Sequence, residues 1–374
     1  MEENIRRRMR KAAWAFLLIE VLVLPCVYAA GQGDSLSLLF VGDLMQHDAQ
    51  LDAARQPDGT FDYAPCFAEV DAEIRKADIA IGNLEVPLGG RPYSGYPAFS
   101  APDEWLYAIR DAGFDVLLAA NNHCLDRGTR GLVRTVEMFD SLGMDYAGIY
   151  RDSLERVKRY PLLVGKKGFR VAFLNYTYGT NGIPVDYPAI VNRIDREQIR
   201  KDILSARQMK PDAIIACMHW GIEYELLPEA SDRELAEWML SLGVDHVIGS
   251  HPHVVQPVEI VDTLPDKVPH VVVYSLGNFI SNMSRVHTDG GMMVKLLLKK
   301  SPGRAQLAGC GYSFVWTSRP ALSGKRNFTV YPSDVRPEKL NGVEKSRMDL
   351  FLGNVRKLFK QYTKGIYEYF LERK

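Results

Sequence analysis

Cysteine is scarce in this sequence, with five residues in 374 and no C-x-x-C pair among them. Their wide spacing excludes a zinc ribbon, a dithiol redox motif and a dense disulfide framework. An excess of charge of one sign is also missing, because 46 Lys and Arg balance 46 Asp and Glu. Without a net positive field, no nucleic-acid partner is expected.

A long apolar run is absent as well. The apolar stretch from Ala12 to Leu24 is short for a membrane span and is interrupted by Glu20. Basic residues precede it and small residues follow it, which is the layout of a secretory signal. Residues 1–30 are therefore predicted to be a signal peptide or an N-terminal anchor, with acylation of Cys26 as a further alternative. The protein is expected to be exported to the cell envelope, either periplasmic or anchored on the outer face of the membrane.

The rest of the chain has the composition of a globular domain, without repeats or low-complexity linkers. Residues 34–340 are predicted to form one domain. From residue 36 to about 249, short apolar runs alternate with amphipathic segments, which favours an α/β core with helices outside. After His253, strand-like segments follow one another and predict a second, largely antiparallel sheet. Residues 341–374 are predicted to be an amphipathic helix packed on the domain, with residues 344–372 helical and a membrane-surface role as the alternative.

Three local predictions are specific enough to check. Residues 65–76 are predicted to form one helix, because their apolar positions recur at helical spacing. Residues 161–164 and 170–174 are predicted to form a hairpin around a Gly-Lys-Lys-Gly turn. The run from Ser231 to Glu234 is predicted to be a capping box that opens a helix ending at Leu242.

Metal-binding types of residue follow five of the predicted strands, at the point where each strand ends. They are Asp43, Glu85, Asn122 and His123, His219, and the pair His251 and His253. Because ligands in open α/β sheets bind outside the carboxyl ends of the strands, these positions are expected to share one rim. Each residue alone has a structural explanation, such as turn formation, but five consecutive strand ends favour a metal site. Mixed oxygen and nitrogen ligands suit one or two divalent ions of Mn, Fe or Zn.

The chemistry of such a centre is well defined. Two cations about 3.5–4 Å apart, bridged by a carboxylate, hold a hydroxide nucleophile and polarise a phosphoryl or carbonyl oxygen. A histidine that lies near the metals without binding them can protonate the leaving group.

The motifs at these strand ends resemble those of the bacterial capsule-synthesis CapA family. They are Gly-Asp-Leu-Met (42–45), Asn-Leu-Glu (83–85), Asn-Asn-His (121–123), His-Trp-Gly-Ile-Glu-Tyr (219–224), His-Pro-His-Val-Val-Gln (251–256) and Tyr-Ser-Leu-Gly-Asn-Phe (274–279). That family is linked to poly-γ-glutamate capsule production and is similar to the calcineurin-like metallophosphoesterases. The resemblance implies an α/β fold of metallophosphoesterase type, a four-layer α/β/β/α sandwich of two mixed sheets.

The resemblance also implies a division of the metal ligands. By analogy with the metallophosphoesterases, Asp43 and His253 would bind one metal, and Glu85 would bridge. The second metal would be bound by Asn122, His219 and His251.

His123 would then be the unbound acid, with Asp126 orienting it. One position departs from the metallophosphoesterase pattern: Met45 stands where a histidine ligand is usual. The first metal site therefore lacks a ligand, and it is weak, completed by His47, or empty.

Four further residues are candidates for substrate contact or catalysis. Glu223 and Glu225 are paired carboxylates that would share a face of an extended segment, and Glu223 is predicted to act in acid–base catalysis. Trp220 is predicted to stack on substrate, with a purely structural wall as the alternative. Asn278 is predicted to lie in a tight loop at the site and to contact substrate.

The favoured function is an exported metal-dependent enzyme that cuts or transfers an amide or phosphoester bond in poly-γ-glutamate or another anionic surface polymer. The first alternative is a non-catalytic, polymer-binding component of a capsule assembly and export complex. The second is a metallophosphodiesterase. The expected partners are the polymer itself and a membrane-bound polymer ligase or exporter.

Overall fold

The structure is a computed structural model that describes residues 34–262, 268–301 and 303–371. The predicted signal or anchor, residues 1–30, lies outside this part of the chain. Within the described ranges, no helix combines the length and the apolar character that a membrane crossing requires.

The first of two large sheets is built outward from strand β1 (Ser35–Leu44). Parallel strands lie on one side of β1: β2 (Ile79–Leu84), β3 (Val116–Leu118) and β4 (Asp145–Ala147). Antiparallel strands continue from its other side: β14 (Gly290–Lys299), β15 (Gln306–Ser318) and β16 (Thr329–Pro332). Two short strands complete the sheet, namely β13 (Asn278–Ile280) beside the end of β1 and β17 (Tyr367–Glu368) beside β15.

The second sheet has a parallel centre and antiparallel edges. Its strand order is β11-β12-β10-β9-β7-β6. The parallel strands are β7 (Phe169–Thr177), β9 (Ala213–His219), β10 (His246–Ser250) and β12 (His270–Val273). The edges are β6 (Leu162–Lys166) and β11 (Val258–Val261), and β6 and β7 form the predicted hairpin. A small separate pair consists of β5 (Ile149–Tyr150) and β8 (Ile190–Val191).

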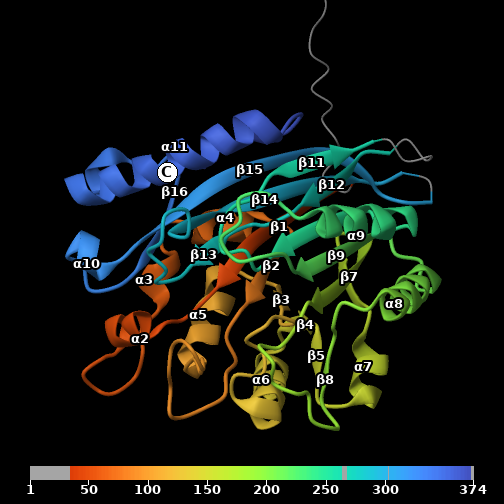
Figure 1. Cartoon of the computed structure of the whole chain (residues 1–374), viewed down its shortest axis with the longest axis horizontal. Coiled ribbons are helices and arrows are strands. Elements are labelled where there is room, and N and C mark those ends of the chain that lie inside the picture. The colour runs from red at the N-terminus through yellow and green to blue at the C-terminus, as the bar shows by residue number, and fades with distance from the viewer. Residues whose placement is uncertain (1–33, 263–267, 302, 372–374) are drawn as a thin grey trace, which may run out of the picture. The chain divides into compact units, whose positions relative to one another are not determined.

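The two sheets pack face to face, with helices on their outer faces. Phe40 of β1 contacts Phe173 of β7 across the interface, with ring centroids 6.4 Å apart. Figure 1 shows α8 (Arg196–Gln208) and α9 (Ala230–Ser241) beside the second sheet and α11 (Gly342–Tyr362) along β15. The remaining helices are α2 (Asp48–Ala54), α3 (Ala64–Phe67), α4 (Asp71–Lys76), α5 (Asp103–Ala112), α6 (Gly128–Leu142), α7 (Ser153–Arg159) and α10 (Pro320–Ser323). This arrangement confirms the four-layer α/β/β/α sandwich of two mixed sheets.

The C-terminal strands do not form the separate antiparallel sheet that their sequence pattern predicts. β14, β15 and β16 extend the first sheet from β1, whereas β11 and β12 extend the second sheet from β10. The pattern identifies strands but not their neighbours. Pairing with β14 covers the edge of β1 that β2 leaves open, which removes a row of unpaired backbone groups.

Helix α11 packs through an apolar stripe, and it is shorter than predicted. Phe359 lies 4.7 Å from Tyr312 and 5.0 Å from Phe314, measured between ring centroids. The helix ends at Tyr362, because Thr363 has an extended backbone and Gly365 is in the left-handed region with φ of 74°. The chain then adds strand β17, so the predicted helical segment 344–372 is too long.

Two other local predictions need correction. The segment 65–76 forms two short helices, α3 and α4, instead of one continuous helix. Helix α9 begins earlier than predicted, and its capping box joins Glu229 to Asp232, whose Oδ2 accepts a hydrogen bond from the Glu229 N–H. Overlapping acidic residues offer two registers for the same cap, and sequence alone does not separate them.

The loops after the central strands are brought together by an unusually close backbone contact. The Asp43 N–H donates to the carbonyl oxygen of Gly277 over 3.0 Å, which fixes β13 against the end of β1. A Cβ atom added at Gly42 would lie 1.8 Å from that oxygen, so only glycine fits there. The contact places Asn278 next to Asp43 at the rim of the first sheet.

Candidate metal centre

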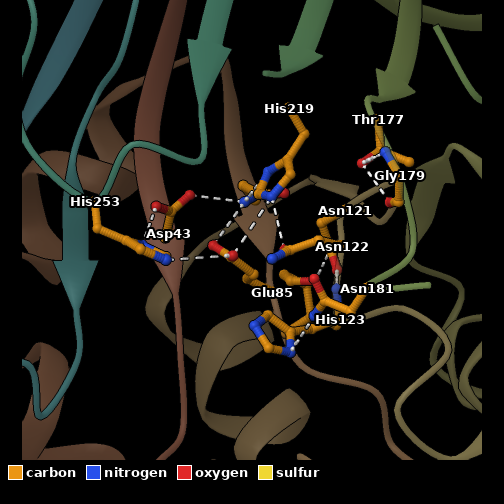
Figure 2. A network of polar contacts seen from close by, with 12 residues as sticks. Asp43, Glu85, Asn121, Asn122, His123, Thr177, Gly179, Asn181, His219 and His253 are labelled. Atoms are coloured by element: carbon orange, nitrogen blue, oxygen red, sulfur yellow. Dashed lines mark hydrogen bonds and ion pairs between the residues drawn. The ribbon is translucent and has the colours of Figure 1, made fainter. Parts of the chain in front are cut away.

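Acidic and imidazole side chains from both sheets converge where the strands end. Figure 2 shows Asp43, Glu85, His219 and His253 pointing toward one another. Asp43 lies in β1 and Glu85 directly follows β2, whereas His219 ends β9 and His253 follows β10. All four side chains are buried.

Glu85 lies at the centre of this cluster and lacks a hydrogen-bond partner on one oxygen. Its Oε1 is buried and unpaired, 3.4 Å from His219 Nε2 and 3.8 Å from His253 Nε2. Burial raises the pKa of Glu85 well above its usual range, and the charge of Asp43 raises it further. A buried carboxylate in this position is stable when it is neutral or when it faces a cation.

The possible ligand atoms fall into two overlapping groups. One contains Asp43, Glu85 and His219, and the other contains Glu85, His251 and His253, with the ligand atoms of each group within 4.8 Å of one another. Glu85 belongs to both groups, as a bridging residue would. The groups cut across the division of ligands that the resemblance implies, since Asp43 is grouped with His219 and His251 with His253.

His253 is oriented by two residues of the first sheet. Its Nδ1 lies 3.1 Å from Asp43 Oδ2 and 3.1 Å from Asn278 Oδ1. Burial lowers the pKa of His253, but the hydrogen bond and charge of Asp43 raise it by more, so the net shift is upward. Asn278 is fully buried and donates from Nδ2 to the Thr288 carbonyl oxygen over 2.8 Å. It therefore positions His253 and does not face a substrate, which corrects its predicted role.

His219 and His251 are held in the neutral form that binds metals. Burial lowers the pKa of His219 well below its usual value, and it lowers that of His251 to about 2. His219 Nε2 lies 3.0 Å from Asn122 Oδ1, so the predicted amide ligand is within reach of the cluster. His251 Nδ1 is buried without a partner.

The loop that carries the last two histidines is strained. His251 has φ of 103° and His253 has φ of 58°, a region that residues with a side chain rarely adopt. Such strain persists where the surrounding structure enforces it, and it is concentrated at functional sites.

His123 and Asp126 form a pair beside the cluster. His123 Nδ1 lies 2.8 Å from Asp126 Oδ2, which also accepts a hydrogen bond from the Phe99 N–H over 2.9 Å. The Phe99 ring packs edge-on against the imidazole at a centroid distance of 4.8 Å. Neither group of possible metal ligands includes His123. An imidazole that a carboxylate orients in this way is suited to proton transfer.

A hollow of about 340 Å³ opens next to this pair. It is lined by Tyr96, Pro97, Ala98, Asn122, His123, Asp126, Asn181, Ile183 and Glu223. Glu223 is exposed and lines the hollow, as a residue that contacts substrate must. Glu225 is not part of the lining, and its backbone oxygen accepts a hydrogen bond from the Gln256 side chain. The structure therefore places one member of the predicted carboxylate pair at the site.

Trp220 lies behind the centre and is not accessible to a substrate. Its side chain is 2% exposed, and its Nε1–H donates to the Tyr274 carbonyl oxygen over 3.0 Å. The indole ring also packs against the Tyr274 ring. Trp220 therefore forms the wall of the site, and the predicted stacking on substrate is not supported.

Met45, the position that departs from the metallophosphoesterase pattern, and its neighbour His47 both make contacts within the first sheet and its loops. Met45 is buried and its N–H donates to the Ile280 carbonyl oxygen. His47 Nδ1 lies 3.2 Å from Gln50 Oε1 and 3.3 Å from the Asn282 backbone nitrogen. His47 belongs to neither possible ligand group.

Sequence reasoning missed three residues of the centre. Asn83 Nδ2 donates to Asp43 Oδ1 over 2.7 Å and lies 3.4 Å from Glu85 Oε2. Tyr178 covers two imidazoles, with its ring centroid 4.5 Å from that of His251 and nearly parallel to the His219 ring. The third is Asn181, which lies 3.4 Å from His123 Nδ1 through its Nδ2.

Tyr178 and Asn181 follow β7, a sixth strand end at the same rim. The predicted strand stopped at residue 174, whereas β7 continues to Thr177. The signal was the polar run after the apolar stretch, which reads Asn-Tyr-Thr-Tyr-Gly-Thr-Asn from 175 to 181. Applying the strand-end rule to this strand identifies both residues.

The donor set fits a divalent cation. It offers two carboxylates, one carboxamide and three imidazoles, and the unpaired Glu85 Oε1 and His251 Nδ1 are both buried there. Unpaired buried polar atoms are rare unless an ion or water binds them. Oxygen and nitrogen ligands of this kind favour Mn, Fe or Zn.

The comparisons with known proteins agree with the motifs. The family profile described as bacterial capsule synthesis protein PGA_cap matches residues 37–283. The chain is 28% identical over 279 residues to the capsule biosynthesis protein CapA of Bacillus anthracis, covering 72% of this chain and 65% of that protein. It is 28% identical over 281 residues to the PGA biosynthesis protein CapA of Bacillus subtilis (strain 168), covering 72% and 69%. The matched region thus spans about two thirds of these relatives.

Among solved structures, the chain is similar to the calcineurin-like phosphoesterase YfkN from Bacillus subtilis. The identity is 15%, the TM-score is 0.43, and the match covers 86% of this chain and 99% of that one. The fold assignment rests on the sheet topology described above.

Proposed function

This chain belongs to the bacterial capsule synthesis PGA_cap family, and on that premise we propose that it is an exported, metal-dependent hydrolase or transferase of capsule biosynthesis. Its substrate would be poly-γ-glutamate or a related anionic surface polymer. The observation that carries the proposal is Glu85, a buried carboxylate with one unpaired oxygen within 3.8 Å of imidazoles from the opposite sheet. This arrangement is unfavourable without a cation and favourable with one.

The cation would be held by six residues: Asp43, Glu85, Asn122, His219, His251 and His253. When bound, it would polarise the scissile carbonyl or phosphoryl oxygen and lower the pKa of a water molecule. Asn83 and Asn278 hold Asp43 and His253 in place through hydrogen bonds of 2.7 Å and 3.1 Å. The ligands are thus fixed before any substrate arrives, which reduces the cost of reorganisation.

Proton transfer would fall to His123. Asp126 accepts a hydrogen bond at the imidazole Nδ1, which fixes the tautomer and leaves Nε2 to carry a proton to the leaving group. The Asp126 oxygen is itself held by the Phe99 N–H. The side chains of His123 and Asp126 are 5% and 2% exposed, so bulk water does not compete for this hydrogen bond.

Export and a membrane-bound partner are part of the proposal. A basic N-terminus, an apolar stretch and small residues support secretion. A membrane-bound polymer ligase or exporter would supply the polymer to this protein. Pull-down of the full chain from cell envelopes, with cytosol as the comparison, tests both points.

A non-catalytic, polymer-binding role is the second candidate, because Met45 leaves one metal position without its usual ligand. A single ion would still bind polymer carboxylates. The phosphodiesterase alternative would instead require turnover of a phosphodiester.

Metal analysis combined with substrate turnover separates these functions. We expect the purified protein to contain at least one equivalent of transition metal. His219→Ala and His251→Ala should lose it, while the control His287→Ala, outside the centre, should retain it.

Cleavage of poly-γ-glutamate that is lost in both variants supports the enzyme, and binding without cleavage supports the second candidate. Turnover of a generic phosphodiester that is lost in Asp43→Ala supports the third. Less than one equivalent of metal, with function unchanged in His219→Ala and His251→Ala, would refute the hypothesis of a metal-dependent protein.

A further inference from the structure

The hollow beside His123 has an unusual charge for a protein that handles an anionic polymer. None of its nine described lining residues is Lys or Arg. Two carboxylates, Asp126 and Glu223, and two carboxamides, Asn122 and Asn181, supply its polar surface. Sites that bind phosphate or carboxylate groups are usually built with Arg or Lys. This hollow has the opposite character.

The hydrogen bonds from His123 and from the Phe99 N–H both end on Asp126 Oδ2. Glu223 is more exposed than Asp126, so it is the carboxylate more accessible to a ligand. Its segment is held against the histidine loop, because the Tyr224 N–H donates to the Pro252 carbonyl oxygen over 2.8 Å. Tyr224 has φ of 71° and Gly221 has φ of 84°, so a tight turn presents Glu223 to the hollow.

The charge of Glu223 contributes to the pKa shifts of two residues of the metal centre, Glu85 and Tyr178. Burial is the main cause of the raised pKa of Glu85, with the charge of Glu223 among the smaller contributions. Burial, followed by the charge of Glu223, also raises the pKa of Tyr178. The negative charge of Glu223 thus acts on residues of the metal centre, although its side chain is exposed to solvent.

We propose that this hollow binds a positively charged amine group on the leaving side of the substrate, with Glu223 as the residue that recognises it. The proposal rests on the proposed function, and it narrows the substrate to an amide whose nitrogen belongs to an amine-bearing group. The assignment to the leaving side follows from His123, which lines the same hollow and is the proposed proton donor to the leaving group. A phosphate or carboxylate in this hollow would be repelled by the negative charge of Glu223.

The reaction balances with water as the only co-reactant. The oxygen of water forms a bond to the amide carbonyl carbon, and the carbon–nitrogen bond breaks. The nitrogen takes one proton from His123 and leaves as an amine, which is protonated at neutral pH. The other product is the polymer carboxylic acid, which gives its proton to the amine and leaves a carboxylate and an ammonium. The second proton of water restores His123.

The carboxylates of the hollow also disfavour cleavage of one kind of bond in the polymer. Cutting between two γ-linked glutamates would place the α-carboxylate of the leaving residue in the acidic hollow. An amide between a polymer carboxyl group and a diamine-type group places an ammonium there instead. The favoured bond is thus a junction between the polymer and an amine-bearing component.

A matched pair of γ-amides of N-acetylglutamate tests the proposal, one made with 1,5-diaminopentane and the other with glutamate. For each, the Kd for the metal-loaded protein is measured by calorimetry, and kcat/KM by release of the amine. We expect the wild type to favour the cationic amide by roughly tenfold or more, the effect of one nearby charge in a partly solvated site. Glu223→Gln should remove most of the preference, and Glu223→Lys should reverse it.

Glu225→Lys is the matched control, since Glu225 is exposed but does not line the hollow. It should retain the wild-type preference. Equal binding of the two amides by the wild type, or an unchanged preference in Glu223→Lys, overturns the proposal. Binding preference without turnover of either amide upholds it and refutes the hydrolase. Turnover of the amides without a binding preference supports the hydrolase and refutes the proposal that the hollow binds an amine.

Discussion

The two rims that meet at the candidate centre contribute different chemistry. The first sheet supplies oxygen atoms, from Asp43, Glu85 and the carboxamide of Asn122, whereas the second supplies the imidazoles of His219, His251 and His253. Neither rim offers a complete site. The carboxylates of the first sheet face imidazoles of the second sheet instead of further carboxylates, so the packing of the sheets brings no additional negative charge against them. The centre therefore depends on how the sheets pack.

Removing the charge of Glu85, which belongs to both ligand groups, is expected to have the largest effect on metal binding. Glu85→Gln keeps the shape of the side chain but removes the charge that both ligand groups share, so metal affinity should fall at least about 100-fold. The metal-free protein should behave in the opposite way, because the substitution removes an unpaired buried carboxylate. Its melting temperature should rise by several degrees. Isothermal titration with Mn²⁺ or Zn²⁺ and thermal unfolding in EDTA measure the two effects. Unchanged metal affinity would show that Glu85 is not a ligand.

The pH dependence of the metal-free protein follows from the same residue. The pKa of Glu85 is raised in the folded state, so the folded protein binds a proton that the unfolded chain releases above its ordinary pKa of about 4.3. The contribution of Glu85 to stability is thus fully present below that pH and is lost as the pH rises through the raised folded value. Glu85→Gln should flatten this part of the stability profile. An identical profile in the variant would contradict the assignment.

The imidazole rim is tested by a pair of substitutions at His251. His251→Gly and His251→Ala both remove the ligand and should lower metal affinity by about 10- to 100-fold. They should differ in stability, because φ of 103° suits glycine and strains alanine. We expect the glycine variant to be more stable by about 1 kcal/mol in chemical denaturation without metal. Equal stability would mean that the loop relaxes when the imidazole is lost.

Tyr178 gives a smaller effect that separates its ring from its hydroxyl group. Tyr178→Phe keeps the ring over His219 and His251 and should bind metal within about threefold of the wild type. Tyr178→Ala uncovers both imidazoles and should weaken binding by roughly tenfold. Metal titration of the two variants is decisive, and equal losses would assign the effect to the hydroxyl group instead.

Much of this centre could be predicted from sequence because its residues directly follow apolar strands. Asp43, Glu85, Asn122, His219 and His253 were found in this way, and the structure brings them together. The rule says where a side chain is, but not which atoms it meets. Asn278 and Trp220 lie at the predicted places, yet their polar atoms are taken by His253 and by the Tyr274 backbone.

What sequence could not supply is contact between distant segments. Strand β7 continues to Thr177, whereas the predicted strand ends at residue 174. The loop with Tyr178 and Asn181 was therefore not predicted to lie at the centre. The prediction of a second, antiparallel sheet from the C-terminal strands was wrong for a related reason. Apolar periodicity identifies β14 as a strand, but its pairing with β1 is decided by which sheet edge remains open.

X-ray absorption spectroscopy of the metal-loaded protein tests the central claim most directly, because it reports the atoms bound to the ion. The two rims predict a mixed shell of imidazole nitrogens and carboxylate oxygens, at about 2.0–2.2 Å for zinc. The imidazole signal should decrease in His219→Ala, and the oxygen shell should change in Glu85→Gln. A shell of oxygen atoms alone, unchanged in both variants, would contradict a centre built from two sheets.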